Sequence, residues 1–316
     1  MFKLFKTSAA CVAALLADVT AGSKAGLGDG EQAFWTSFDG CEFPFTKWLP
    51  PGAAQPKALV VYAHGLSGAA ADFEQIGELF SSKGIAVYAY ELRGMGNDPK
   101  KKRVGDLRSQ SDWAADFDTF LSFARHHHRG VPLFAYGESL GALIIMHGYP
   151  SLSEVNRAAL RGLVYSSPVV SMQGELPPVK DFFVRLAMRL FPRLKISLKA
   201  LSGGGEVEVG EGEDHWAQME QTPHFVSRMS LRLLGTIESM VKGSAAAAAP
   251  IQKPVLVLYP GLDVFTPAAD VERFFDGIEA RDKSKRRFDE SHHLLMYDKE
   301  REQVFGTSLD WIRERS

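Results

Sequence analysis

The sequence predicts an α/β fold with a mostly parallel, eight-stranded sheet that is covered by helices on both faces. Two observations predict it. Short runs of strand-type residues alternate with longer runs of helical period along most of the 316 residues. Several strand-type runs, such as 58–63 and 131–136, are apolar nearly throughout, which is typical of strands buried on both faces. Alternation of this kind favours parallel neighbours, because each pair needs a crossover connection.

The elements follow in order along the chain. The strand pattern is carried by residues 31–38, 43–49, 58–63, 85–90, 131–136, 162–166, 255–259 and 285–288. The helical pattern is carried by residues 70–82, 109–127, 140–148, 268–280 and 300–315. Each predicted strand is short and each predicted helix is longer, as the two periods require.

The alternation stops between Pro168 and Pro250. No convincing strand is expected there, and the pattern predicts two amphipathic helices around a glycine-rich acidic loop, 203–214. The alanine run 245–249 then indicates a low-complexity linker back to the sheet. We therefore expect a core formed by residues 22–167 and 251–316, with a helical cap, 168–250, inserted after the sixth strand.

The N-terminal residues have two interpretations. Lys3 and Lys6 precede an apolar stretch, 9–17, and small residues at 19–21 offer a cleavage site, as in a secretory signal peptide. Asp18 lies close to that site and the apolar stretch is short, which favours a plain N-terminal extension. Residues 1–21 thus predict either a secreted or membrane-associated protein or, without a signal, a cytoplasmic one.

Composition and motifs exclude several function classes. The formal net charge is −2, so no overall field favours nucleic acid as a partner. The sequence lacks a zinc-ribbon spacing, a P-loop and a dinucleotide-binding glycine pattern, so we expect no cofactor and no metal. Cys11 and Cys41 are too few for a disulfide framework. The histidines at 126–128 stand before Gly130, where cationic residues are expected at the end of a helix.

A nucleophile motif follows the fifth predicted strand. The residues Gly137-Glu138-Ser139-Leu140-Gly141 lie between that strand and an apolar helical segment, which is the context of a nucleophile elbow. Gly137 and Gly141 leave room for the chain to pass itself in this tight turn. The turn predicts Ser139 as a nucleophile exposed at the edge of the sheet.

A serine needs a base to remove its proton, and the base needs a group that orients it. On a sheet of this kind, the acid follows a late strand and the histidine follows the last one. Asp263 and His292 stand at these places. We expect Asp263 to orient His292, with His293 as the alternative base and Asp289 as the reserve acid.

Two backbone amides should stabilise the oxyanion that forms when the serine attacks. One belongs to Leu140, directly after the nucleophile, and the other is expected in the loop after the third strand, at Leu66. Gly65 allows that loop to approach closely. We interpret His64, before it, as a residue that braces the loop.

These motifs together resemble the monoglyceride lipase branch of the α/β-hydrolases, also called the serine aminopeptidase-like or lysophospholipase-like group. The resemblance rests on His64-Gly65, the segment 91–96, the elbow and the two loops with Asp263 and His292, and it extends over residues 34–311. It implies an α/β-hydrolase fold with a cap and the hydrolysis of acyl esters of glycerol or related lipids. Glu138 departs from the histidine that these lipases often carry, and Pro260 departs from a glycine.

The first cap helix gives a hint about the substrate. Its apolar residues recur at helical spacing, and three arginines recur every four positions on another face. The apolar residues are Val179, Phe182, Phe183, Leu186 and Leu190, and the arginines are Arg185, Arg189 and Arg193. Such a helix favours peripheral contact of residues 179–194 with a membrane surface. Alternatively, its apolar face only covers the substrate pocket, with the arginines in solvent.

The sequence thus predicts a serine hydrolase that cleaves carboxylic esters through an acyl-enzyme, with a lipid ester as its small-molecule substrate and monoacylglycerol as the favoured one. A lysophospholipid, a small ester or a peptide amide fits the same three residues. A ligand-binding protein without activity is a different class, which the presence of Ser139, Asp263 and His292 disfavours. An epoxide or haloalkane hydrolase would need an aspartate in place of Ser139.

Overall fold

The computed structural model describes residues 30–52, 55–172, 178–197 and 223–316, and the side chains of 178–180 are not described. The predictions for residues 1–21 and for the acidic loop 203–214 fall outside these residues. The described helices include none with the length and apolar character needed to cross a bilayer.

The core is one eight-stranded sheet, as predicted, in the order β1-β2-β4-β3-β5-β6-β9-β10. Only the pairs β1–β2 and β2–β4 are antiparallel, and the remaining five pairs are parallel. The strands are β1 (Glu31–Thr36), β2 (Glu42–Trp48), β3 (Ala58–Ala63), β4 (Ile85–Tyr90), β5 (Leu133–Glu138), β6 (Leu160–Ser166), β9 (Val255–Pro260) and β10 (Lys283–Phe288). This is the α/β-hydrolase fold. Four of its strands, β3, β4, β5 and β9, are buried along their whole length, as expected for strands with helices on both faces.

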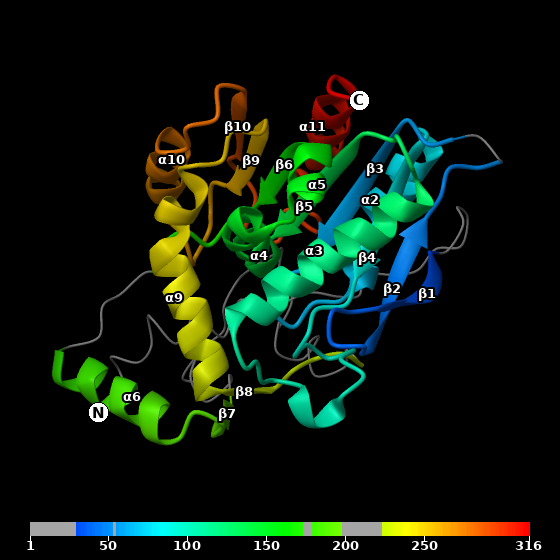
Figure 1. Ribbon diagram of the computed structural model, residues 1–316. Coiled ribbons are helices and arrows are strands. Elements are labelled where there is room, and N and C mark those ends of the chain that lie inside the picture. Colours follow the sequence, from blue (N-terminus) through cyan, green and yellow to red (C-terminus); the bar gives the residue numbers. More distant parts are fainter. Residues whose placement is uncertain (1–29, 53–54, 173–177, 198–222) are drawn as a thin grey trace.

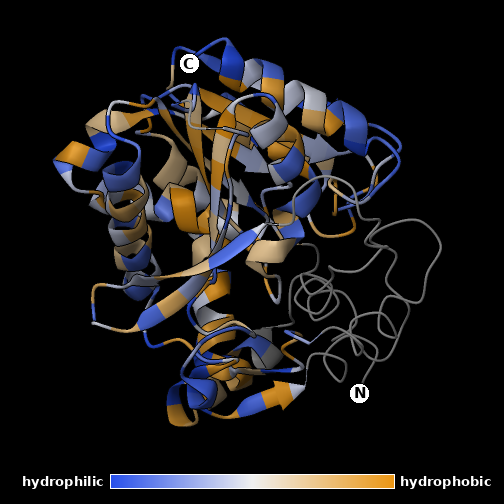
Figure 2. Cartoon of the chain, turned by 90° about the vertical axis from the view of Figure 1, so that its right-hand side faces the viewer, coloured by the Kyte–Doolittle hydropathy of each residue, from blue (hydrophilic) through white to orange (hydrophobic). Residues whose placement is uncertain are grey.

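Helices cover both faces of the sheet (Figure 1). One face is packed by α3 (Gln110–His127), α4 (Leu140–Gly148), α9 (Leu231–Ala248) and α10 (Ala268–Asp276). The other is packed by η1 (Ala70–Phe73), α2 (Glu74–Ser82) and α11 (Arg301–Arg313). Figure 2 shows the result, with hydrophobic strands inside and hydrophilic residues on the outer helices. The short helices η2 (Lys101–Arg103), η3 (Tyr149–Ser151) and α5 (Glu154–Ala159) lie in connections.

Helix α3 illustrates why these residues form these elements. Its N-cap, Ser109, accepts a hydrogen bond from the Ser111 N–H at 3.2 Å. Trp113, Phe117 and Phe120 recur at helical spacing and are buried. The helix ends at His127, and Gly130 follows with φ of +78°, in agreement with the role in helix termination that the sequence predicts for the three histidines.

The segment between β6 and β9 differs from its prediction in three ways. It contains two short paired strands, β7 (Lys195–Ser197) and β8 (Arg228–Ser230), besides α6 (Pro178–Leu190) and α9. The second predicted helix, for which the family resemblance implies residues 223–241, is α9 and begins only at Leu231, because Ser230 caps it through the Leu233 N–H at 3.2 Å. The linker prediction for 245–249 is wrong, because α9 continues to Ala248. Alanine has the highest helix propensity, so the run extends the helix.

The start of α9 is fixed to the core through Asp106, in the connection between β4 and α3. The carboxylate of Asp106 accepts hydrogen bonds from Ser230 Oγ and Arg232 Nε, both at 2.6 Å. The Ser230 N–H also donates to the carbonyl of Gly105 at 2.7 Å. Figure 1 shows α6, β7 and β8 together at the lower edge of the molecule, with α9 running down to them from the sheet.

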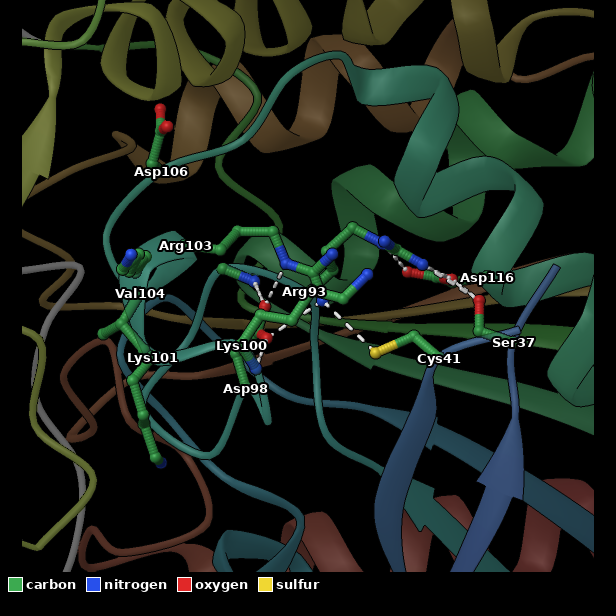
Figure 3. Close-up of polar contacts among 12 residues, drawn as sticks. Ser37, Cys41, Arg93, Asp98, Lys100, Lys101, Arg103, Val104, Asp106 and Asp116 are labelled. Atoms are coloured by element: carbon green, nitrogen blue, oxygen red, sulfur yellow. Dashed lines mark hydrogen bonds and ion pairs between the residues drawn. The ribbon is translucent and has the colours of Figure 1, made fainter. Parts of the chain in front are cut away.

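A buried arginine braces the same connection from the other side (Figure 3). Arg93, 3% exposed, donates to both oxygens of Asp116 in α3 at 2.7 Å and to Asp39 at 2.8 Å. Asp116 also accepts a hydrogen bond from Ser37, which follows β1. A buried charge with such partners is strongly held. The network therefore fixes the residues after β4, which contact the loop after β3.

Candidate active site

Ser139 lies at the turn between β5 and α4. Its φ is +51° and its ψ is −111°, in a region that residues other than glycine rarely adopt. The Ser139 N–H donates to the carbonyl of Ser166 on β6 at 2.9 Å, which holds the turn in place. Such a strained serine at the carboxyl edge of the sheet has the geometry of a nucleophile elbow.

The two glycines of the elbow are required by space. A Cβ atom at Gly141 would lie 1.9 Å from the carbonyl oxygen of Ala63, and one at Gly137 would lie 2.5 Å from the Ala142 nitrogen. Both distances are too short for any side chain. The backbone of α4 can therefore approach β3 and β5 only with glycine at these positions, as the sequence predicts.

His293 lies between Ser139 and Asp263. Its Nε2 atom is 3.0 Å from Ser139 Oγ, and its Nδ1 atom is 3.0 Å from Asp263 Oδ2. The side chains of His293 and Asp263 are only 1% and 2% exposed. The three residues therefore form a continuous hydrogen-bonded line at the carboxyl ends of β5, β9 and β10.

The prediction that His292 faces Ser139 is wrong by one residue. His292 points to Asp298 instead, with Nδ1 at 2.9 Å from Asp298 Oδ2, and its backbone N–H donates to the same oxygen at 2.6 Å. Since Asp298 fixes His292, the ring of His293 is the one directed at the serine.

The loop after β9 places Asp263 as predicted from the sequence. Asp263 Oδ1 accepts the Phe265 N–H at 2.8 Å, which fixes the carboxylate. Pro260 does not displace this loop, because it remains in β9 opposite Phe288. The reserve acid, Asp289, is outside the site: its side chain is 75% exposed and pairs with Arg287 at 2.8 Å.

The hydrogen bonds assign the tautomer of His293. A carboxylate can only accept, so the Nδ1–H donates to Asp263, and Nε2 is left to accept the Ser139 hydroxyl proton. Ser167 Oγ donates to the backbone carbonyl of His293 at 2.5 Å, which further fixes the loop. A serine, a neutral histidine and a carboxylate in this arrangement can transfer acyl groups.

The sequence predicts that the N–H groups of Leu66 and Leu140 stabilise the oxyanion. Within the described part of the chain, neither group donates a backbone hydrogen bond in a turn, loop or cap, and both residues are buried. A Cβ atom at Gly65 would point at Ser139, with Cβ to Cβ of 3.6 Å. This is an ordinary contact distance, so the loop after β3 lies directly against the nucleophile at Gly65.

His64 braces the loop that carries Leu66. Its Nε2 accepts the Leu92 N–H at 3.0 Å, so its Nδ1 carries the proton and donates to the carbonyl of Gly65 at 2.8 Å. The ring is fully buried. His64 therefore links the loop after β3 to the residues after β4, as the sequence predicts, and is not available as a second base.

Glu138, beside the nucleophile, points into the core and not toward substrate. Its Oε2 accepts a hydrogen bond from Tyr62 OH at 2.6 Å, and its Oε1 is buried without a partner among the described residues. Burial raises the pKa of Glu138, because the charged form is costly to desolvate. Only the tertiary structure reveals the contact with Tyr62, which sequence analysis missed.

A metal centre is not among the features of this site. Within the described ranges, no group of three or more His, Cys, Asp or Glu side chains could hold a metal ion.

The chain is similar to known proteins. The family model described as "Serine aminopeptidase, S33" matches residues 54–300. A monoacylglycerol lipase of Mycolicibacterium smegmatis is 25% identical over 277 residues, which cover 86% of this chain and 93% of that protein. The phospholipase YtpA of Bacillus subtilis is 24% identical over 258 residues, which cover 80% of this chain and 94% of that protein.

Solved structures share the fold. A soluble variant of the monoglyceride lipase of Saccharomyces cerevisiae, in complex with a substrate analogue, aligns with a TM-score of 0.79 at 16% identity, covering 94% of this chain and 99% of that one. The monoacylglycerol lipase of Paleococcus ferrophilus aligns with a TM-score of 0.72 at 23% identity, covering 87% of this chain and 100% of that one.

Proposed function

The chain belongs to the serine aminopeptidase S33 family of the α/β-hydrolases, and we propose that it is a lipase or esterase that cleaves carboxylic esters through an acyl-enzyme. The observation that carries the proposal is the line of hydrogen bonds from Ser139 through His293 to Asp263, with both distances at 3.0 Å. A protein that only binds a ligand would have no need of a serine in a strained backbone conformation that is hydrogen-bonded to a general base.

In the first half of the reaction, Ser139 Oγ attacks the ester carbonyl while His293 Nε2 takes its proton. The charge that develops on the carbonyl oxygen is stabilised by the N–H groups of Leu66 and Leu140. Asp263 stabilises the imidazolium that forms. His293 then gives the proton to the departing alcohol, and the acyl group stays on Ser139.

In the second half, a water molecule takes the place of the alcohol. His293 Nε2 accepts a proton from this water, which attacks the acyl-enzyme and passes through the same oxyanion site. The proton returns to Ser139 Oγ, and the carboxylic acid leaves. Both halves use the same three side chains, so no further cofactor is required by the proposal.

We favour monoacylglycerol as the substrate. The similarity to the monoacylglycerol lipase of M. smegmatis extends over most of both chains, which supports an acylglycerol. The exposed apolar residues of α6 suit a protein that acts on substrates with an acyl chain. A lysophospholipid is the second candidate, because the similar B. subtilis protein is a phospholipase.

The direct test compares release of fatty acid from monoacylglycerol, lysophospholipid and a short nitrophenyl ester. We expect turnover of all three with the highest kcat/KM for monoacylglycerol, and none with Ser139→Ala. A preference for the short ester would contradict the lipid assignment and leave the esterase. No turnover of any ester by the unmodified protein would contradict the proposed function.

We also propose that α6 and the residues after it, 179–194, touch a lipid surface. Six large apolar side chains are exposed there: Phe182, Phe183, Leu186, Leu190, Phe191 and Leu194. Arg185 pairs with Asp181 at 2.7 Å, and Arg189 and Arg193 are exposed beside the apolar residues. An amphipathic helix with this arrangement binds at the boundary of head groups and acyl chains.

Vesicle binding tests this contact. We expect Phe182→Ser with Leu190→Ser to reduce cosedimentation with vesicles of phosphatidylcholine and phosphatidylglycerol. The matched control is Val155→Ser, which removes an apolar side chain that is 57% exposed on α5. Because α5 directly precedes β6, it lies at the amino end of that strand, whereas the candidate active site lies at the carboxyl ends of the strands. Equal binding by both variants would contradict a role of α6.

A further inference from the structure

Behind the loop that carries Leu66 lies a group of buried ionisable side chains that the proposed reaction does not use. They come from four separate segments and are at most 8% exposed. They are His64, Asp72, Glu91 and His224. Buried polar groups normally have hydrogen-bond partners, so those without one call for an explanation.

Asp72 and Glu91 hold the backbone of this loop. Asp72 Oδ2 accepts the Ala69 N–H at 2.7 Å, and Glu91 Oε1 accepts the Ala70 N–H at 3.1 Å. A Cβ atom at Gly68 would lie 2.4 Å from Asp72 Oδ2, so the carboxylate is pressed directly against the turn. The two carboxylates thus fix the chain three and four residues after Leu66.

Asp72 also connects two other segments to this loop. Tyr297, four residues after His293, donates through its hydroxyl to the backbone carbonyl of Asp72 at 2.5 Å. On the other side, His224 Nε2 lies 3.8 Å from Asp72 Oδ1. The histidine-bearing loop, the loop with Leu66 and the segment that leads to β8 therefore meet at one residue, Asp72, the first through its backbone carbonyl and the other two through its carboxylate.

The contact between His224 and Asp72 is incomplete. Both Asp72 Oδ1 and His224 Nε2 are buried without a hydrogen-bond partner among the described residues. Leaving such atoms unpaired in the interior destabilises the folded state. The backbone of His224 is confined, since a Cβ at Gly96 would lie 1.8 Å from its carbonyl oxygen. A movement of about 1 Å by the ring would bring the two atoms to hydrogen-bond distance.

One proton would satisfy both atoms. His64 cannot supply it, because its two nitrogens are engaged with Leu92 and Gly65. Burial raises the pKa of Asp72, and burial lowers the pKa of His224. Burial therefore disfavours the charged form of each group. A neutral pair that shares one proton between Asp72 Oδ1 and His224 Nε2 avoids the desolvation of either charge.

We propose that His224 is a positioning residue, which shares a proton with Asp72 Oδ1 and thereby holds the turn that aims the Leu66 N–H at the oxyanion. The inference rests on the proposed function, since it assigns the pair a role in the same reaction. His224 belongs to the segment between β6 and β9, so it makes the oxyanion loop depend on the docking of that segment.

The kinetic test uses His224→Ala, with a nitrophenyl ester as substrate. We expect kcat to fall by about 10-fold to 100-fold, as for a modest misplacement of a catalytic group, with KM little changed. The amide acts mainly on the transition state, so the loss falls on kcat. His224→Gln should restore most of kcat, because its amide can donate to Asp72.

The matched control is His147→Ala. His147, on α4, is also a partly buried histidine at the boundary with α9, and its Nε2 lies 2.7 Å from the carbonyl of Met240. Among the described residues, His147 forms no hydrogen bond with Asp72. A purely structural effect would lower the melting temperature of both variants and leave kcat similar in the two.

A second measurement does not depend on activity. Hydrogen exchange of the peptide 64–73 should become faster in His224→Ala than in the unmodified protein, and unchanged in His147→Ala. Unchanged exchange, or a kcat of His224→Ala equal to that of His147→Ala, would overturn the inference. Absence of ester turnover in the unmodified protein would instead overturn the proposed function, and the exchange result would still decide the role of His224 in the loop.

Discussion

Two neighbouring histidines in this protein have nearly the same first contact but different surroundings. His292 Nδ1 lies 2.9 Å from Asp298, and His293 Nδ1 lies 3.0 Å from Asp263. Only His293 has its other nitrogen directed at a serine, Ser139, at 3.0 Å. A carboxylate–histidine pair is therefore not enough to identify a catalytic base, and what decides is the group that faces Nε2.

The largest expected effect separates the two histidines directly. His293→Ala should reduce kcat by on the order of 10⁵-fold or more, because it removes the base that activates Ser139. His292→Ala should leave kcat within a few-fold, since its ring lies on the Asp298 side. Steady-state hydrolysis of a nitrophenyl ester measures both, and a dead His292→Ala with an active His293→Ala would reverse our assignment.

The carboxylates that pair with the two histidines should also differ in their effect on kcat, with Asp263 the more important. Asp263→Asn should lower kcat by about 10⁴-fold, because an amide in place of the carboxylate favours the wrong tautomer of His293. Asp298→Asn keeps the shape of a side chain whose hydrogen bonds, among the described residues, are to His292 and the Lys299 N–H, so we expect little change in kcat. Similar losses in both variants would show that the two pairs act as one unit.

Asp298, whose replacement should change kcat little, should matter for the free energy of unfolding. Asp298 is fully buried and accepts hydrogen bonds from the N–H groups of His292 and Lys299 besides the His292 ring. Asp298→Ala leaves these donors unpaired, so we expect a loss of about 1–3 kcal/mol in the free energy of unfolding. Urea denaturation measures it, and an unchanged midpoint would mean that the loop can relax around the missing carboxylate.

The ion pair between Asp39 and Arg93 should make the stability of the protein depend on pH. The hydrogen bond from Arg93 holds the pKa of Asp39 well below its usual range. A lowered pKa contributes stability above the unfolded value of about 3.9, and this is lost as the pH falls through the folded value. The melting temperature of Asp39→Asn should therefore lie below that of the unmodified protein at pH 7, and the gap should narrow below about pH 4. A constant gap would contradict this role.

The fold and the nucleophile could be predicted from the sequence because they rest on local patterns. Strand-type runs mark β3 and β5, and the pentapeptide Gly137-Glu138-Ser139-Leu140-Gly141 is a recognisable motif between a strand and a helix. The choice between His292 and His293 depends on Asp298, whose contact with His292 exists only in the folded loop. No local pattern distinguishes two adjacent histidines.

The segment between β6 and β9 was harder for a related reason. Its alanine run reads as low complexity, although the same residues extend α9 once Ser230 caps the helix against Asp106. His224 and Asp72 are separated by more than a hundred residues, and neither belongs to a recognisable motif. Contacts of this kind depend on how the segment docks on the core, which sequence periodicity does not describe.

The central claim is that Ser139 is a nucleophile activated by His293, and covalent labelling tests it most directly. The protein is incubated with a fluorophosphonate probe, digested and mapped by mass spectrometry. We predict one adduct, on Ser139, which forms quickly in the native protein and in His292→Ala but slowly in His293→Ala. No adduct on Ser139, or equally fast labelling after the loss of His293, would contradict the account.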